Sequence, residues 1–379
     1  MKKIAKLSLA TVVALASTSA FAGDNTILGD NTTISGKLYV EQTISTSDTV
    51  GTQNDGDSSS AFEIDYDFTL KTKVTDTLTA VVNIEGDTQG TAGTNVESQE
   101  NGANSSQALQ VSNAYFTYAP GKYSVSLGRT DINTPNTDGE EGEGVWGTYS
   151  AGPVTIAGAH FTTNDADAVA DTLGENDIST SDINAAAIMG SFEGINLEAW
   201  YVSVSDVADN YTYVASTSIE GFDLSARYAT TDYDTAYSTG NLKDGDTLIL
   251  TAGTKIENAS LRAKYLSTDK EGEAMVTDPS SANTAELVHF TANKADASAW
   301  LIGGSYPLTS ALTAHLDYGK IDFNNGNATE DDASEIVAKL TYAFSKNAVA
   351  SVRYADYNEQ VDSVETDKSQ ARVDLTYKF

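Results

Sequence analysis

The last thirteen residues of the chain, Asp367–Phe379, read DKSQARVDLTYKF, and from Gln370 onward polar and apolar side chains alternate strictly. The apolar positions are Ala371, Val373, Leu375, Tyr377 and Phe379. Because successive side chains of a strand point to opposite faces, one face of this segment suits hydrocarbon and the other suits water. A strand of this kind, ending on an aromatic residue, predicts one wall segment of a transmembrane β-barrel.

The same alternation recurs along the chain in pairs of segments joined by short turns. Phe62–Leu70 is followed by a turn at Val74–Asp76 and by Leu78–Ile84, and similar hairpins turn at Glu220–Gly221 and Glu257–Asn258. Barrels of the outer membrane have short turns at one end and long polar loops at the other. The predicted long loops are Thr46–Ser60, Asp87–Ser106, Thr163–Asp182, Thr231–Gly245, Thr268–Ala295, Asp322–Asp332 and Asn358–Thr366.

These patterns predict an all-β fold, a closed antiparallel transmembrane β-barrel. Bacterial barrels have an even number of strands. About eighteen strands result when Gly144–Ala151 is included, and sixteen is the alternative. Aromatic residues near the short turns, such as Phe192 and Phe222, and near the loops, such as Tyr201 and Tyr228, predict two girdles at the membrane surfaces.

The N-terminus predicts which membrane is meant. Met1–Ala22 combines a lysine-rich start, the apolar run Leu7–Ala16 and a small-residue end, which is typical of a secretory signal. The barrel domain is therefore expected to span residues 23–379. We expect it in the outer membrane of a Gram-negative bacterium, in contact with lipid and lipopolysaccharide.

Charge narrows the classes of partner. The chain has 54 acidic and 22 basic residues, a formal net charge of −32, and no cysteine. Nucleic acid is an implausible partner for so negative a chain. In a pore, this excess of acid predicts an interior that concentrates cations. In a soluble protein, it would indicate a halophile or a calcium binder.

Histidine offers little for catalysis. His160, His289 and His315 are the only three, and none stands at the spacing of a zinc site or a catalytic triad. The chain is therefore expected not to be an enzyme and to require no cofactor.

One acidic constellation stands out. Asp131–Gly144 reads DINTPNTDGEEGEG and follows Gly128 and Arg129. Its four clustered acids are Asp138, Glu140, Glu141 and Glu143. From Leu127 to Ile156 the chain resembles the Gram-negative porins, and most of all the Campylobacter-type major outer-membrane porins. Their third external loop leaves the strand after a Gly-Arg pair and folds into the pore.

The resemblance implies that these acids line a pore constriction opposite basic residues on the wall. Strand parity places the candidate basic residues on the water-facing side, with Lys37 expected across the barrel seam from Arg372. The six candidates are Lys37, Arg227, Arg262, Lys264, Arg353 and Arg372. Each could equally make a salt bridge inside the lumen, to Asp223, Glu335 or Asp374. The acidic run could also be a solvated surface loop.

The resemblance further implies a homotrimer, with Asp87–Ser106 available to latch a neighbouring subunit. It makes calcium at Asp138, Glu140 and Glu141 a secondary hypothesis, consistent with the oxygen ligands that this ion prefers.

The sequence thus favours a passive outer-membrane diffusion channel that admits ions and small hydrophilic solutes and prefers cations. A barrel of 16 to 18 strands leaves an aqueous channel. The alternatives are a surface adhesin or structural barrel with a closed lumen, and a secreted soluble β-protein.

Overall fold

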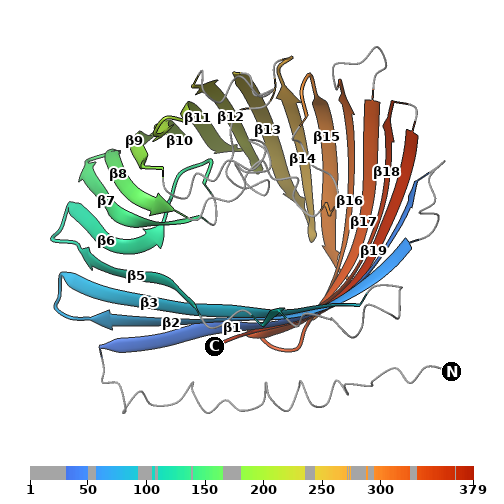
Figure 1. The fold of residues 1–379 in the computed structure, drawn as a ribbon, viewed down its shortest axis with the longest axis horizontal. Coiled ribbons are helices and arrows are strands. Elements are labelled where there is room, and N and C mark those ends of the chain that lie inside the picture. Colours follow the sequence, from blue (N-terminus) through green and yellow to red (C-terminus); the bar gives the residue numbers. More distant parts are fainter. Residues whose placement is uncertain are drawn as a thin grey trace.

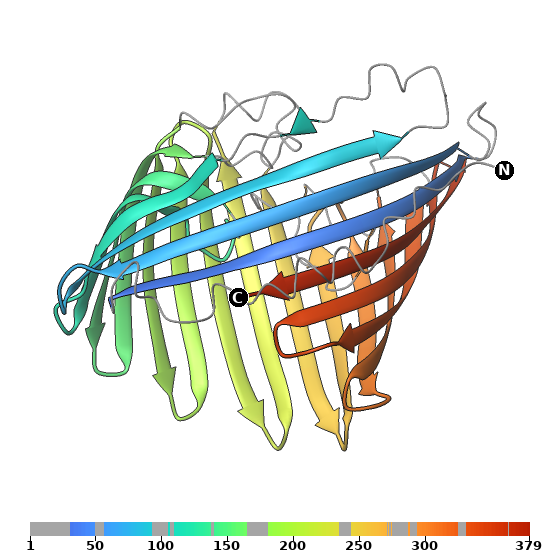
Figure 2. The ribbon, with the colours of Figure 1, turned by 90° about the horizontal axis from the view of Figure 1, so that it is seen from below.

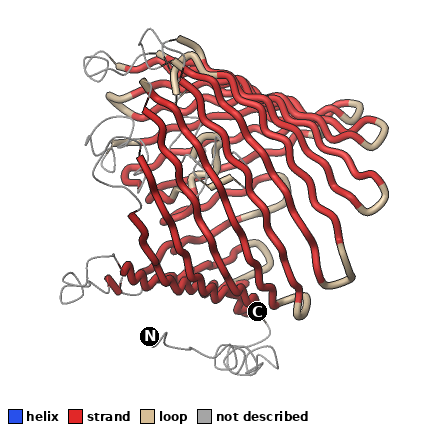
Figure 3. Tube along the Cα trace, turned by 90° about the vertical axis from the view of Figure 1, so that its right-hand side faces the viewer, coloured by secondary structure: helices blue, strands red, loops and turns tan. Residues whose placement is uncertain are grey.

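The computed structural model describes residues 31–49, 57–92, 105–106, 110–137, 140–164, 181–234, 244–270, 272, 274, 287–288, 294–324, 331–362 and 364–379. All regular secondary structure in these residues is β-strand (Figure 3). No helix in these ranges is long and apolar enough to cross a membrane. The predicted signal, residues 1–22, lies outside them. The strands are β1 (Thr32–Thr49), β2 (Asp57–Lys73), β3 (Leu78–Ala92), β4 (Ser105–Ser106), β5 (Gln110–Tyr118), β6 (Tyr123–Asp131), β7 (Glu141–Ala151), β8 (Val154–Asn164), β9 (Ile183–Phe192), β10 (Ile195–Val204), β11 (Ala208–Ile219), β12 (Phe222–Tyr233), β13 (Gly245–Ile256), β14 (Ala259–Thr268), β15 (Ser298–Pro307), β16 (Leu312–Phe323), β17 (Asp331–Ala343), β18 (Ala348–Val361) and β19 (Val364–Lys378).

The strands form one closed antiparallel barrel. Each strand pairs with its neighbours in the chain, and β1 pairs with both β2 and β19, which closes the ring (Figure 1). The two-residue β4 pairs only with the end of β3, and β5 continues the wall beyond it. The other eighteen strands make the wall, so the predicted fold and the favoured strand number are confirmed.

The C-terminal residue completes the seam. Gly36 and Phe379 exchange two backbone hydrogen bonds of 3.1 Å, and the Phe379 ring lies 5.7 Å from that of Phe68. A Cβ on Gly36 would lie 2.4 Å from the Asp67 carbonyl oxygen and 2.7 Å from the Phe379 ring. Glycine is therefore required where the last aromatic residue lies on the first strand.

The outer face of the wall is apolar and carries the expected aromatic residues. Leu127 and Ile302, on opposite sides of the barrel, expose 63% and 62% of their surface. At the loop end, the Tyr201 hydroxyl donates to Asp209 at 2.9 Å and the Tyr228 hydroxyl to Asp246 at 2.8 Å. An aromatic body with a polar tip is what a membrane interface selects.

The strands extend further into the polar segments than predicted. The expected loop Asn358–Thr366 is wrong, because β18 runs to Val361 and β19 starts at Val364. Asn358 bonds across this hairpin to Glu365 at 3.1 Å and to Asp367 at 2.8 Å. Above the bilayer both faces of a strand meet water. A polar segment without an apolar face can therefore still form backbone hydrogen bonds with a neighbouring strand. Figure 2 shows the blue N-terminal strands crossing the view at a steep angle to the strands of the middle of the chain.

The seam geometry generates a stability prediction. We expect Gly36→Val to destabilise the folded barrel by roughly 1–3 kcal/mol, because the added side chain overlaps backbone and ring atoms. Gly147→Val is the control, since the nearest atom to a Cβ there lies at 3.8 Å. The measurement is the temperature at which the heat-modifiable gel mobility is lost. Equal heat resistance of the two variants would contradict the role given to the seam.

Candidate pore constriction and lumen wall

The segment between β6 and β7 lies inside the barrel. Its ends are tied by a hydrogen bond of 2.8 Å from the Ile132 amide to the Glu140 carbonyl oxygen. Ile132 is buried in a cluster of side chains on the inner face of the wall. The other members of that cluster are Phe161, Ile183, Ala185, Val202, Val204, Val207, Ala208 and Tyr233. The third loop is thus packed against the lumen face of β8–β12.

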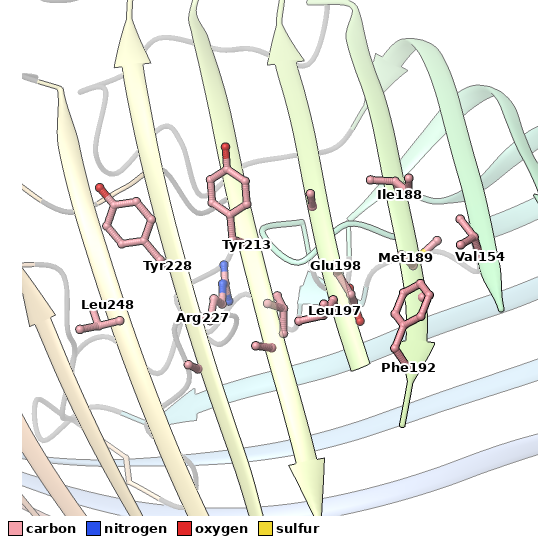
Figure 4. A pocket seen from close by; sticks show the side chains of 15 residues that line it. Val154, Ile188, Met189, Phe192, Leu197, Glu198, Tyr213, Arg227, Tyr228 and Leu248 are labelled. Carbon is pink, nitrogen blue, oxygen red and sulfur yellow. The ribbon is translucent and has the colours of Figure 1, made fainter. Parts of the chain in front are cut away.

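Asn136 fixes this loop to the far wall. It is fully buried, and its amide nitrogen donates to Asn210 and, at 2.8 Å, to Thr212 on β11. Its side-chain oxygen accepts a hydrogen bond from the Arg227 guanidinium on β12. Figure 4 shows Arg227 and Tyr228 at consecutive positions on β12, beside Tyr213. Tyr228 belongs to the exposed outer face, so Arg227 belongs to the lumen face.

Gly128 allows the chain to leave the wall. Its φ is +133°, and a Cβ would lie 2.3 Å from the Ala114 carbonyl oxygen. Beyond this point β6 pairs with β5 for one residue only, Arg129, whose Nε donates to the Ser112 carbonyl oxygen at 2.8 Å. Asn113 then donates to Asp131 at 2.9 Å. The Gly-Arg pair therefore marks the bend at which the hairpin separates from β5.

The four predicted constriction acids differ in their placement. Glu140 ends the loop, whereas Glu141 and Glu143 already belong to β7. Glu141 forms an ion pair with Arg129 at 3.3 Å, and Glu143 is exposed, opposite Arg129 in the strand register. Asp138 lies outside the described residues. The role of these acids in a constriction stays a prediction.

The six predicted basic residues alternate with outward apolar positions on their strands and lie on the lumen face. Arg262 is held by Asp317, with Nη2 and Nε at 2.5 and 3.1 Å from Oδ1. Lys264 follows on the same face of β14. In the register, Gly303 of β15 separates Arg262 from Asp317, and a Cβ there would lie 1.8 Å from Oδ1. Glycine on the middle strand thus allows the ion pair to cross it.

A second charged group spans the seam. Arg372 lies 2.9 Å from Glu41 and 3.5 Å from Asp374. The adjacent Arg353 donates to Gln370 at 2.6 Å. The expectation that Lys37 lies across the seam from Arg372 is wrong.

The seam register explains this difference. Arg372 faces Thr43 and Lys37 faces Lys378, because the two strands are offset by several residues from the assumed alignment. The salt bridge of Arg372 to Asp374 was one of the alternatives left open by the sequence. Glu335 and Asp223 instead accept hydrogen bonds from the Val288 amide and the Ser218 hydroxyl.

A second inward contact was not predicted. Leu287, from the segment between β14 and β15, packs on a buried cluster of the lumen face of β13–β18. The neighbouring Val288 amide donates to both oxygens of Glu335, at 3.0 and 3.1 Å, and Glu335 is almost fully buried. The only sequence signal is an apolar pair within a long polar stretch.

The histidines and acids show no metal centre in the part of the chain that the structure describes. No group of three or more His, Asp or Glu side chains there is placed to hold an ion. His160 hydrogen-bonds to Asn184 at 2.8 Å, and His315 lies 3.4 Å from the Thr341 hydroxyl. His289 lies outside the described residues.

The anchoring of the third loop generates a second prediction. Asn136→Ala removes buried hydrogen bonds to two strands, each worth about 1–3 kcal/mol when a partner is left unsatisfied. We expect larger fluctuations of the open-channel current in planar bilayers. Asn133→Ala is the control, because the exposed Asn133 donates, among the described residues, only to the Asp131 carbonyl oxygen. A quiet Asn136→Ala channel, indistinguishable from Asn133→Ala, would disprove the anchor.

The ion pair between Arg262 of β14 and Asp317 of β16, which passes over Gly303 of β15, generates a third prediction. Gly303→Ala should separate Arg262 from Asp317 and lower the free energy of unfolding by about 1–3 kcal/mol. Gly253→Ala tests the opposite neighbour of Arg262, where a Cβ has 3.8 Å of room, and should change stability little. Urea unfolding in lipid vesicles measures both. Equal stability of the two variants would refute the requirement for glycine.

Comparison with known proteins agrees with this geometry. Three solved structures share the fold: Pseudomonas aeruginosa OccK9 (OpdG), Acinetobacter baumannii OccAB3, and P. aeruginosa OpdK with vanillate. Their TM-scores are 0.70, 0.70 and 0.67, at 14%, 11% and 13% sequence identity. Each comparison covers 91% of this chain, and 98%, 99% and 98% of the other. A search of curated protein sequences gives no match.

The sequence profile described as Gram-negative porin matches residues 9–362, nearly the whole chain. Together with the closed barrel, this match confirms the predicted outer-membrane location and the expectation that the protein is not an enzyme. The chain belongs to the family of Gram-negative porins.

Proposed function

We propose that this porin is a passive diffusion channel for ions and small hydrophilic solutes, and that it prefers cations. The observation that carries the proposal is the third loop, which Asn136 holds across the lumen face of β11 and β12. A loop so placed narrows the passage. Because the chain carries 54 acids against 22 bases, the potential at the narrowing and the mouth favours cations.

The charged wall supports passage of polar solutes. Arg262 and Asp317, and Arg372 with Glu41 and Asp374, line the inner face as ion pairs. Such a lining favours hydrated solutes over apolar ones, since apolar solutes gain nothing from it. One relative of the same fold is described with vanillate, a small aromatic carboxylate.

Further features of the proposal come from the sequence. The resemblance of Leu127–Ile156 to the Campylobacter-type porins supports that subclass and a homotrimer. Export would remove residues 1–22 and, with them, three lysines and no acid. Calcium at Asp138, Glu140 and Glu141 belongs to the same proposal, as an optional ion and not as a required cofactor.

A selectivity measurement tests the function. Neutralising Asp138, Glu140, Glu141 and Glu143 to the corresponding amides should lower the cation-to-anion permeability ratio at least about twofold, because fixed charge in a narrow passage sets the local ion concentration. The zero-current potential in a KCl gradient measures this ratio. The control neutralises four acids at the outer rim, namely Asp209, Asp232, Asp246 and Asp356, and should leave the ratio nearly unchanged. An anion-selective wild type, or equal effects of both variants, would contradict the proposal.

A further inference from the structure

A row of polar side chains crosses four neighbouring strands of the barrel wall, β1, β2, β3 and β5. The register aligns Lys37 of β1 with Asp67 of β2, Glu85 of β3 and Gln110 of β5. Each alternates with a large apolar residue on the exposed outer face, such as Phe68 or Ile84. The row therefore lies on the lumen face. Asp65, two residues before Asp67, lies on the same face.

These residues line a polar pocket of about 360 Å³. The pocket contains three carboxylates, Asp65, Asp67 and Glu85, with the Lys37 ammonium at one end and the Gln110 amide at the other. Gln110 donates to Glu85 at 3.2 Å, and Lys37 lies 5.7 Å from the centre of the Tyr39 ring. The carboxylates outnumber the ammonium group, so the pocket is suited to cations.

Among the described residues, one oxygen of each of two carboxylates lacks a hydrogen-bond partner. Asp65 Oδ1 and Asp67 Oδ1 are buried, and neither forms a hydrogen bond within the part of the chain that the structure describes. Buried acceptors of this kind are rare, because an unsatisfied polar atom costs free energy. Of the other lumen acids discussed above, Glu41, Asp317 and Asp374 are paired with arginines, and Glu335 and Asp223 accept hydrogen bonds from the Val288 amide and the Ser218 hydroxyl. Asp65 and Asp67 differ from these acids because none of these kinds of partner is present for them among the described residues.

The spacing of the acids indicates the size of the ligand. Within the described ranges no three acidic groups are close enough to hold one metal ion, although three line this pocket. A ligand that reaches all three is therefore larger than a bare ion, and N–H groups suit it because carboxylates accept hydrogen bonds. A primary ammonium group offers three donors and one positive charge.

We propose that this lumen-wall pocket is a binding subsite for small organic cations bearing primary ammonium groups, with Asp65 and Asp67 as its main acceptors. The inference rests on the proposed channel and specifies a class of solute for it. Lys37 limits the affinity through like-charge repulsion, so that a bound cation is also released.

Diamine block of the channel tests the subsite. With 1,4-diaminobutane added to one side of a planar bilayer, we expect interruptions of the wild-type KCl current. Asp65→Asn combined with Asp67→Asn should raise the half-blocking concentration about tenfold, because two charge-assisted hydrogen bonds are lost. Lys37→Gln should lower it. Glu198 of β10 and Asp223 of β12 alternate with the outward Leu197 and Phe222, so they lie on the lumen face away from β1 and β2. The control Glu198→Gln with Asp223→Asn removes the same charge there and should change the half-blocking concentration less than about twofold.

The outcomes separate this subsite from the proposed channel function. An open, cation-preferring wild type without diamine block would overturn the subsite and leave the channel intact. Equal weakening in the pocket and control variants would also overturn it, because general lumen charge would then suffice. If no current is observed, isothermal titration of the purified protein in detergent decides the matter. Binding of 1,4-diaminobutane that Asp65→Asn with Asp67→Asn weakens supports the pocket, and binding that this variant leaves unchanged refutes it.

Discussion

The structure depends on one constraint: in hydrocarbon, every backbone N–H and C=O must pair within the protein. A sheet satisfies it only when its first and last strands meet. Here β1 pairs along thirteen positions with β19, and the terminal Phe379 completes the last contacts of that ladder. With every backbone group of the wall paired, the outer face can be wholly apolar, as the surrounding lipid requires.

Closure of the wall also determines what the interior can contain. Because the lumen face does not have to hold the barrel together, it can carry charges, but each charge still pays for loss of hydration unless it is paired. Arg262 and Arg372 each lie next to an acid, and Arg227 bonds to the third loop. The hydrogen bond that replaces part of the hydration of Arg227 thus also holds the third loop against the wall.

Features that depend on residues near one another in the sequence, such as strands and their two faces, are predictable from the sequence. Contacts that depend on the register between strands are not. Alternation with period two identified the strands, the closed fold and the lumen side of all six basic residues. The Gly-Arg pair and the family resemblance indicated an inward third loop. The contact of Asn136 with Arg227 joins residues 91 apart in sequence, through five intervening strands whose offsets no local pattern records. The offset between β1 and β19 is likewise not recorded in any local pattern, so the sequence does not show that Arg372 faces Thr43 and not Lys37.

Strands in polar segments are also hard to predict from sequence. Asn358–Thr366 looked like a loop because it lacks an apolar face, yet water on both sides removes the need for one. Asp65 and Asp67 were overlooked for a related reason, since acids that alternate with apolar residues resemble any solvated strand face. Their importance becomes visible only when the register shows which acids have partners.

Paired and unpaired charges act on a passing ion over different distances. An ion pair such as Arg262–Asp317 has a dipolar field, which falls off faster than that of a single charge. A carboxylate without a partner acts over roughly the 8 Å screening length of physiological salt. The third loop and Leu287 pack on the apolar clusters of β8–β12 and β13–β18, whereas Asp65 and Asp67 lie on β2, outside both clusters. Asp65 and Asp67 therefore contribute more to the field beside them along the passage than charges that are already paired.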